Sequence, residues 1–243
     1  MPFLFVRLRP SWGFAARLQP QSKMRMAFTY PPPTTLIGAL AYPLVRCMEQ
    51  RREIFFQGRE QLSMAEKLRN DLKVVATSSI GRGVIYGSYL KVNRYYRGSV
   101  EPAVTALPSM ITLGERENIL DIVYVTSREI DDKLLRAGWG ITRIGSRESI
   151  YSVEEVFTGN EKEKETSKVN TRFSFRLNTK IQINGRGTII YVVDWKNTKI
   201  GDYKDVERAP YFYPEGEVTV RSEGFKLKVL ELNLPWGKEG III

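Results

Sequence analysis

Hydrophobic and polar residues alternate at the start of the chain. Residues 3–9 read Phe-Leu-Phe-Val-Arg-Leu-Arg. In an extended strand, Leu4, Val6 and Leu8 share one face, and the other face carries aromatic and basic side chains. Because RNA-recognition folds present such side chains on the open face of a helix-covered sheet, this strand predicts either an RNA platform or a face that a second domain covers.

Three stretches have helical periodicity. Apolar residues repeat every four positions from Leu36 to Met48, which predicts a helix that begins near Thr34 and is kinked or divided at Pro43. A second apolar stripe predicts a helix at about 60–71. Ser127 is the expected N-cap of a third helix that ends at Gly138.

Between these helices the β-branched runs predict strands. The expected strands start at Lys73, at Ile119 and near residue 149, and residues 80–115 are expected to form a long hairpin. The order strand, helix, strand, strand, helix, strand is that of a ferredoxin-like domain, here over residues 1–157 with the hairpin inserted. The predicted class is α+β.

The last third of the chain reads differently. Residues 158–168 are polar and highly charged, and we expect a loop or linker there. Residues 169–243 predict a small antiparallel β-rich domain, with a hairpin turn at Asn184-Gly185 and a second strand boundary at Glu223-Gly224.

The net charge of +10 is concentrated in two blocks. Residues 1–48 carry six basic residues and no acidic residue, and residues 72–100 carry five and none. Such blocks fit either a polyanion partner or a basic solvated surface. Aromatic residues within both blocks, which can stack on unpaired bases, favour single-stranded nucleic acid. They are Trp12, Phe14, Phe28, Tyr30, Tyr86, Tyr89, Tyr95 and Tyr96.

Composition excludes several kinds of chemistry. The chain has no histidine and one cysteine, Cys47, so it lacks the usual nucleophile pairs, imidazole metal ligands and an internal disulfide. We expect no catalytic residue, no metal and no cofactor. The apolar start is broken at Arg7, and no apolar run is long enough for a membrane span, so we expect a cytoplasmic protein with no membrane partner.

A glycine-rich segment follows the third predicted helix. Residues 140–146 read Gly-Ile-Thr-Arg-Ile-Gly-Ser, which lacks the lysine of a nucleotide-binding P-loop. Arg143, Ser146 and Arg147 could contact a phosphodiester beside exposed backbone N–H groups. The alternative is that the glycines only permit a tight turn before a strand.

Two motifs in this order resemble a known family. Residues 30–41 read Tyr-Pro-Pro-Pro-Thr-Thr-Leu-Ile-Gly-Ala-Leu-Ala and follow Trp12-Gly13-Phe14; residues 142–149 read Thr-Arg-Ile-Gly-Ser-Arg-Glu-Ser. They resemble the Cas-five subunits of class 1 CRISPR effector complexes, most closely the archaeal type I-A members. The resemblance covers about residues 1–157. The proline-threonine motif also has a purely structural interpretation, since prolines fix a helix entry and threonine caps it.

The resemblance implies a function and partners. It implies a ferredoxin-like domain with a β-hairpin thumb that caps the 5′ handle of the CRISPR guide RNA. The implied partners are this RNA, the backbone and large subunits of Cascade, and target DNA within the complex. The candidate RNA-binding residues, taken from the basic blocks and the motifs, are Arg9, Trp12, Arg17, Lys23, Arg25, Tyr30, Arg82, Tyr86, Lys91, Arg94, Tyr95, Tyr96, Arg97, Arg143, Gly145, Ser146 and Arg147.

Two alternatives stay open. Type I-C members of the resembling family cut repeat RNA with tyrosine, lysine and histidine, so a metal-independent CRISPR-repeat endoribonuclease is one alternative. The absence of histidine favours a protein that is not an enzyme. A scaffold that contacts only protein is the second alternative.

Overall fold

The computed structural model describes residues 1–16, 28–48, 52–78, 83–112, 118–146, 149–178, 180–200 and 206–243. In the long hairpin, side chains are described for Tyr95, residues 97–100 and residues 109–112. Within these ranges no helix is long and apolar enough to cross a membrane.

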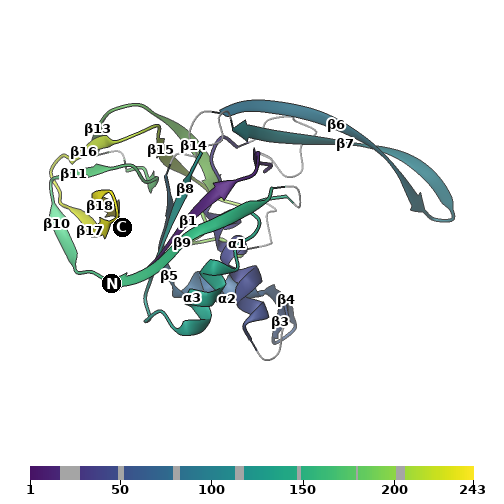
Figure 1. Cartoon of the computed structure of the whole chain (residues 1–243), viewed down its shortest axis with the longest axis horizontal. Helices are drawn as coiled ribbons and strands as arrows, with labels where there is room; N and C mark the ends of the chain where they lie inside the picture. The colour runs from purple at the N-terminus through teal and green to yellow at the C-terminus, as the bar shows by residue number, and fades with distance from the viewer. Residues whose placement is uncertain are drawn as a thin grey trace.

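A four-stranded antiparallel sheet forms the centre of the molecule (Figure 1). Its strands, in spatial order, are β5 (Leu72–Thr77), β8 (Leu120–Thr126), β1 (Pro2–Pro10) and β9 (Tyr151–Asn160). Helices α1 (Pro33–Arg46), α2 (Met64–Asp71) and α3 (Asp132–Trp139) lie along one side of it.

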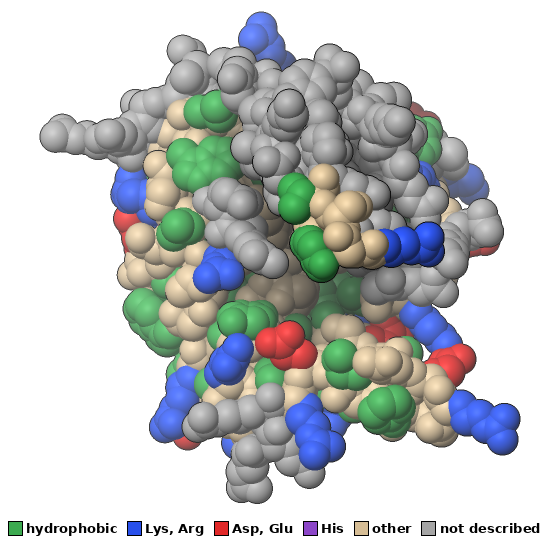
Figure 2. Space-filling model, turned by 90° about the vertical axis from the view of Figure 1, so that its right-hand side faces the viewer, with side chains coloured by type: hydrophobic (Ala, Val, Ile, Leu, Met, Phe, Trp, Pro, Cys, Tyr) green, Lys and Arg blue, Asp and Glu red, His purple; other side chains and the backbone are tan. Residues whose placement is uncertain are grey.

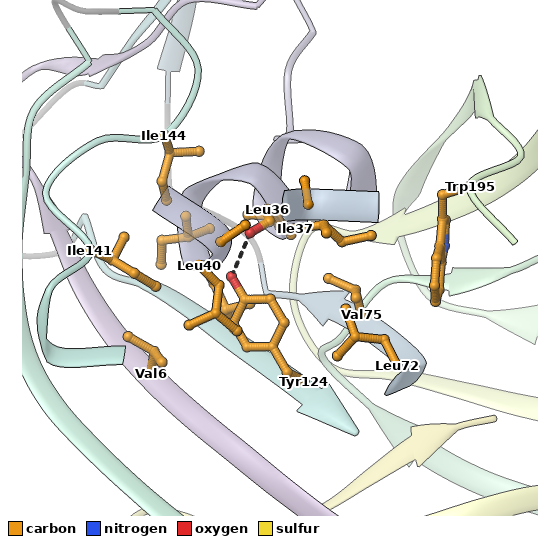
Figure 3. Packing of buried hydrophobic residues seen from close by; sticks show 14 of the residues in the cluster. Val6, Leu36, Ile37, Leu40, Leu72, Val75, Tyr124, Ile141, Ile144 and Trp195 are labelled. Atoms are coloured by element: carbon orange, nitrogen blue, oxygen red, sulfur yellow. Dashed lines mark hydrogen bonds between the residues drawn. The ribbon is translucent and has the colours of Figure 1, made fainter. Parts of the chain in front are cut away.

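The helix-facing side of the sheet forms the largest hydrophobic core (Figure 3). Val6 of β1 and Leu40 of α1 are completely buried in it. The hydroxyl of Tyr124 donates a hydrogen bond of 2.9 Å to the carbonyl oxygen of Leu36, so the sheet is joined to α1 inside this core. Burial raises the pKa of Tyr124, which therefore stays protonated.

Helices α1 and α3 differ from the prediction, α1 in its interior and α3 at its N-terminus. Helix α1 begins with Pro33 in its first turn and continues without division through Pro43. The N-cap of α3 is Asp131, whose Oδ1 accepts a hydrogen bond of 2.8 Å from Leu134 N, and the prediction of Ser127 is wrong. The hydroxyl of Ser127 instead donates to the carbonyl oxygen of Asp71.

The opposite face of the sheet is covered. Phe3 and Phe5 are 3% and 0% exposed and pack in a second core with Leu230, Leu232 and Ile241. These three residues lie on β17 (Leu227–Leu234) and β18 (Gly237–Ile242). Of the two interpretations of the first strand, the covering second domain is the one observed, and this face is not an open platform.

The carboxy-terminal region consists of three small sheets of three strands each in the described chain. The first contains β10 (Glu163–Thr166), β17 and β18; the second contains β11 (Lys168–Thr171), β16 (Val218–Ser222) and β13 (Ile181–Asn184); the third contains β12 (Phe175–Arg176), β15 (Arg208–Pro214) and β14 (Gly187–Val193).

The charged segment 158–168 is not a loop. Its first residues continue β9, and residues 163–166 form β10. The charges alternate in sign and form cross-strand ion pairs, with Lys228 Nζ 3.1 Å from Glu163 and Lys164 Nζ 3.3 Å from Glu231. The expectation of a linker is therefore corrected, because charge complementarity across the strands supports a sheet here.

The turn at Asn184-Gly185 does not close a hairpin. It follows β13, whereas the next strand, β14, belongs to another sheet. Gly185 has φ +138°, and a Cβ there would lie 2.5 Å from Cγ1 of Val218. The glycine is needed where the chain passes closely over β16, and the hairpin prediction is wrong. Glu223-Gly224 separates β16 from β17, which also lie in different sheets.

A long hairpin projects from this body (Figure 1). It consists of β6 (Gly83–Tyr96) and β7 (Ser99–Thr112), paired along their whole length. Its base adds the short strand β2 (Gly13–Phe14). A smaller hairpin, β3 (Ile54–Gln57) with β4 (Glu60–Ser63), precedes α2, so the helix expected at 60–71 begins at Met64 with Ser63 as its N-cap.

Candidate nucleic-acid interface

The base of the long hairpin is bonded to the loop after β1. The carbonyl oxygen of Trp12 accepts hydrogen bonds from the backbone N–H and the hydroxyl of Thr112, at 2.7 and 3.0 Å. The next residue, Gly13, has φ +142°, and a Cβ there would lie only 1.9 Å from the carbonyl oxygen of Met110. Only glycine fits this close approach, which sets the position of the hairpin on the body.

The glycine-rich segment lies against the same loop. Ser146 N donates to the carbonyl oxygen of Ala15 at 3.1 Å, and Ala15 N donates to Ser149 Oγ at 2.9 Å. Gly145 has φ +90°, and its added Cβ would lie 2.6 Å from the Ala15 carbonyl oxygen. The structure therefore brings three predicted segments together: the loop after β1, the hairpin base and the glycine-rich turn.

These contacts change the interpretation of Gly145 and Ser146. The Ser146 hydroxyl lies 3.1 Å from Ser149 Oγ, and its N–H is already bonded to Ala15. Both residues thus build the turn, as in the structural alternative considered above. The neighbouring side chain of Arg143 is exposed at the start of the turn and can reach an anion in solvent. Arg147 lies outside the described residues.

The tip of the hairpin presents an aromatic and a basic side chain. Arg97 and Gly98 have φ 48° and 85° and form a two-residue turn between the paired residues Tyr96 and Ser99. The Tyr95 side chain is 76% exposed, and Arg97 is exposed beside it. A tyrosine ring can stack on a base and a guanidinium can contact a phosphate, so this tip has the chemistry of a single-strand contact.

Other predicted site residues are placed elsewhere. Tyr30 is 7% exposed, and its ring stacks on that of Tyr213 with centroids 4.9 Å apart, so it belongs to the core and offers no open face to a base. Arg9 forms an ion pair with Glu154, and Trp12 is half-buried. The side chains of Tyr86, Lys91, Arg94 and Tyr96, and the whole of Arg17, Lys23, Arg25 and Arg82, lie outside what the structure describes.

The face toward which the hairpin projects is basic where side chains are described. Figure 2 shows this face, and its coloured charged side chains are mostly lysine and arginine. Such a surface raises the local concentration of a polyanion.

One basic cluster was missed from the sequence. Lys73, Arg176 and Lys196 line one small cavity, together with Tyr211 and Trp195. Burial lowers the pKa of Lys196, and the positive charges of Arg176 and Lys73 lower it further, whereas burial raises the pKa of Tyr211 to about 12. Because the three cations come from distant parts of the chain, no local pattern indicates this cluster.

Metal chemistry has no obvious site in the described residues. No group of three or more histidine, cysteine, aspartate or glutamate side chains is found there in a geometry that could hold a metal ion.

Comparison with known proteins places the chain in a family. No protein-family model matches it. It is 31% identical over 204 residues to the CRISPR-associated protein Cas5 3 of Saccharolobus solfataricus, a match that covers 79% of this chain and 78% of the relative. It is also 32% identical over 204 residues to the CRISPR system aCascade subunit Cas5 1 of the same organism. A crystal structure of a CRISPR protein from Archaeoglobus fulgidus has a similar fold, with a TM-score of 0.65 and 21% identity over 100% of this chain and 99% of that chain.

The fold, mostly strands with three helices in the described chain, and the two curated relatives define a CRISPR-associated protein. The chain belongs to the Cas5 family.

Proposed function

We propose that this protein is a non-catalytic RNA-binding subunit of a type I-A Cascade complex, which caps the 5′ handle of the CRISPR guide RNA. Membership of the Cas5 family supports this role, and one of the relatives is named as a subunit of aCascade. The partners are then the guide RNA, the backbone and large subunits, and target DNA within the complex, all in the cytoplasm.

The central sheet is, in this proposal, a ferredoxin-like domain. The spatial order β5-β8-β1-β9 supports this assignment, because it is the order in which two βαβ halves interleave. The inserted hairpin of β6 and β7 is the thumb. With one face of the sheet covered by helices and the other by β17 and β18, RNA binds at the hairpin and its base rather than on the sheet.

The observation that carries the proposal is the junction at the base of the long hairpin, where the loop after β1 is bonded both to the hairpin and to the glycine-rich turn. This arrangement gives an extended strand of RNA a line of contacts from Arg143 at the base to Tyr95 and Arg97 at the tip. Arginine supplies phosphate contacts, and stacking on an aromatic side chain contributes about 1–3 kcal/mol per base.

The test measures binding and cleavage in one experiment. Purified protein is incubated without metal with labelled repeat RNA and with its processed 5′ handle, and bound and cut RNA are separated. We expect preferential binding of the handle, with the RNA left intact. Tyr95→Ala should weaken binding about tenfold, and Arg97→Glu should weaken it and reduce the slope of the salt dependence by about one unit.

Arg221→Glu is the matched control for the charge change. Arg221 is exposed on β16 in the carboxy-terminal region and lies opposite Lys168 in the sheet, so an acid is tolerated there. It should leave RNA affinity nearly unchanged. Equal affinities for wild type, Arg97→Glu and Tyr95→Ala would reject the thumb assignment.

A metal-independent ribonuclease is the second candidate. The observation that favours it is the cavity that contains both Lys196 and Tyr211, since lysine and tyrosine can together cut RNA without metal. Site-specific scission that Lys196→Ala abolishes would establish this alternative. Absence of both binding and scission would leave the protein-only scaffold.

A further inference from the structure

A second surface lies on the helical side of the molecule, away from the long hairpin (Figure 1). There the β3–β4 hairpin, the residue Met48 that follows α1, and helices α2 and α3 surround a groove of about 670 Å³. Its apolar lining comes from Met48, Ile54, Phe55, Phe56 and Met64. Methionine and aromatic side chains of this kind are enriched in the centres of protein interfaces.

The apolar wall of this groove is open to solvent. Phe56 is 72% exposed and Ile54 is 45% exposed. Both lie on β3, two residues apart, so their side chains point to the same face of the strand. In the described chain β3 pairs only with β4, in a sheet of two strands. Such a sheet is marginally stable alone, and an exposed cluster of large apolar side chains marks a contact surface.

The rim of the groove is positively charged. Arg52, Lys67 and Lys133 line it, all three are exposed, and no aspartate or glutamate lines it within the described residues. Two nearby carboxylates form ion pairs, Glu53 with Arg46 and Asp71 with Arg128, and Asp132, next to Lys133 in the chain, is exposed. In the described residues, the lining of the groove therefore combines an apolar floor with three cations and no carboxylate.

From this combination we propose that the groove docks an amphipathic helical segment of another protein, whose apolar side chains are flanked by carboxylates. Apolar residues spaced three and four apart on a helix would enter between Phe56 and Met64. Flanking carboxylates would lie against Lys67 and Lys133, which line the groove from α2 and α3. A nucleic acid fits less well: Phe55 and Phe56 offer ring faces, but Met48, Ile54 and Met64 offer thioether and aliphatic surface, which suits leucine-type side chains better than bases.

The test uses a fluorescent 18-residue peptide with leucines at positions i, i+3, i+4 and i+7 and glutamates beside them. Full-length protein should bind it saturably in fluorescence anisotropy. Phe56→Ala should weaken binding at least about tenfold, and Lys67→Glu with Lys133→Glu should do the same. A peptide with lysine in place of glutamate should not bind, and neither should a scrambled peptide of the same composition.

Tyr95→Ala is the matched control for Phe56→Ala, since both aromatic side chains are about equally exposed, at 76% and 72%. It should leave peptide binding unchanged, and Phe56→Ala should leave RNA binding unchanged. Circular dichroism and melting temperature show that each variant is folded. No peptide binding by wild type, equal binding of the lysine peptide, or displacement of the peptide by RNA would each overturn the docking groove. Because wild type is also assayed with RNA, failure of the proposed RNA-binding function can be told apart from failure of the docking groove.

Discussion

Arg7 lies between the central sheet and the carboxy-terminal region, although it is one of the cations of the first basic block. Its guanidinium donates to both carboxylate oxygens of Asp121, at 2.8 and 3.1 Å, and lies 4.0 Å from the centre of the Trp236 ring. Burial raises the pKa of Asp121, and the hydrogen bonds from Arg7 oppose that shift. A basic residue of this block can therefore either face solvent, where it is available to RNA, or form an internal ion pair. Arg7 belongs to the second kind and has a structural role.

Removing Arg7 should produce a pH-dependent loss of stability. In Arg7→Met we expect the free energy of unfolding to fall by about 3 kcal/mol at neutral pH, because the Asp121 carboxylate remains buried without its cation. The pKa of Asp121 then rises further, so the folded state binds the proton more tightly than the unfolded state. The destabilisation is absent below the ordinary pKa near 3.8 and grows as the pH rises through the raised pKa.

Urea denaturation near pH 4.5 and pH 7 checks this result. The deficit of Arg7→Met relative to wild type should be smaller at the lower pH. The double variant Arg7→Met, Asp121→Leu removes both charges and should recover much of the loss. A deficit of equal size at both pH values would show that lost packing on Trp236, rather than the unpaired carboxylate, is responsible.

Gly145 should be far less tolerant of alanine than another glycine with positive φ. Gly224 has φ +76° with no atom near its added Cβ, so Gly224→Ala should cost only the left-handed conformation, about 1–2 kcal/mol. Gly145→Ala adds a clash with the Ala15 carbonyl oxygen and should cost clearly more, a difference seen as a larger fall in melting temperature. If the two variants have the same melting temperature, the junction between the glycine-rich turn and the loop after β1 is not rigid.

Among the elements, the long hairpin projects away from the body, and the paired strands beyond its base are the part that can be shortened (Figure 1). In the part of the hairpin that the structure describes, its hydrogen bonds to the body are made at the base, through β2 and Thr112. A variant that deletes residues 90–105 and joins Tyr89 to Ala106 through Asn-Gly keeps the register, since these two residues already face each other. We expect a melting temperature within about 2–4 °C of wild type, the shift produced by about 1 kcal/mol, and a large loss of RNA affinity.

Thermal unfolding and RNA binding of the same preparation check the trimmed hairpin. If the trimmed variant keeps its RNA affinity, the RNA-binding surface lies at the base of the hairpin. A large fall in melting temperature would mean that the deleted part of the hairpin packs on the body.

The elements that could be predicted from the sequence are those whose pattern is local. Alternation identifies β1, and the spacing of leucines identifies α1, because each reflects one buried face. Strand β10 was missed because its charges are matched only by residues 60 or more positions away on β17. The turn at Asn184-Gly185 was misread because both flanking strands find partners elsewhere.

The same distinction applies to the candidate site. The tip at Tyr95 and Arg97 follows from an aromatic and basic run that is contiguous in the chain. The burial of Tyr30 could not be predicted from the sequence around it, because the ring on which it stacks, that of Tyr213, is far away in the chain. Similarly, the docking groove is assembled from four segments, and no window of sequence contains it.

At the scale of the whole molecule, the carboxy-terminal region completes both sides of the central sheet. On one side, β17 and β18 cover Phe3 and Phe5. On the other, Trp195 and Tyr213 join the core beneath the helices, where the Trp195 indole N–H donates to the hydroxyl of Tyr211 at 2.9 Å. Residues 1–157 and 169–243 therefore share their hydrophobic cores.

A chain that ends at Asn160 should consequently not fold as an independent RNA-binding unit. It would expose Phe3, Phe5, Val123 and Val125, each of which is at most 3% exposed in the full chain, and burial of such side chains contributes about 1.5–3 kcal/mol each. We expect strong binding of the dye ANS, loss of a cooperative thermal transition and aggregation. The hairpin-trimmed variant is the control, because it also loses many residues but none of the described residues of these cores. A monomeric, cooperatively melting fragment would show that the sheet is stable with one open face, and that face would then become available to RNA.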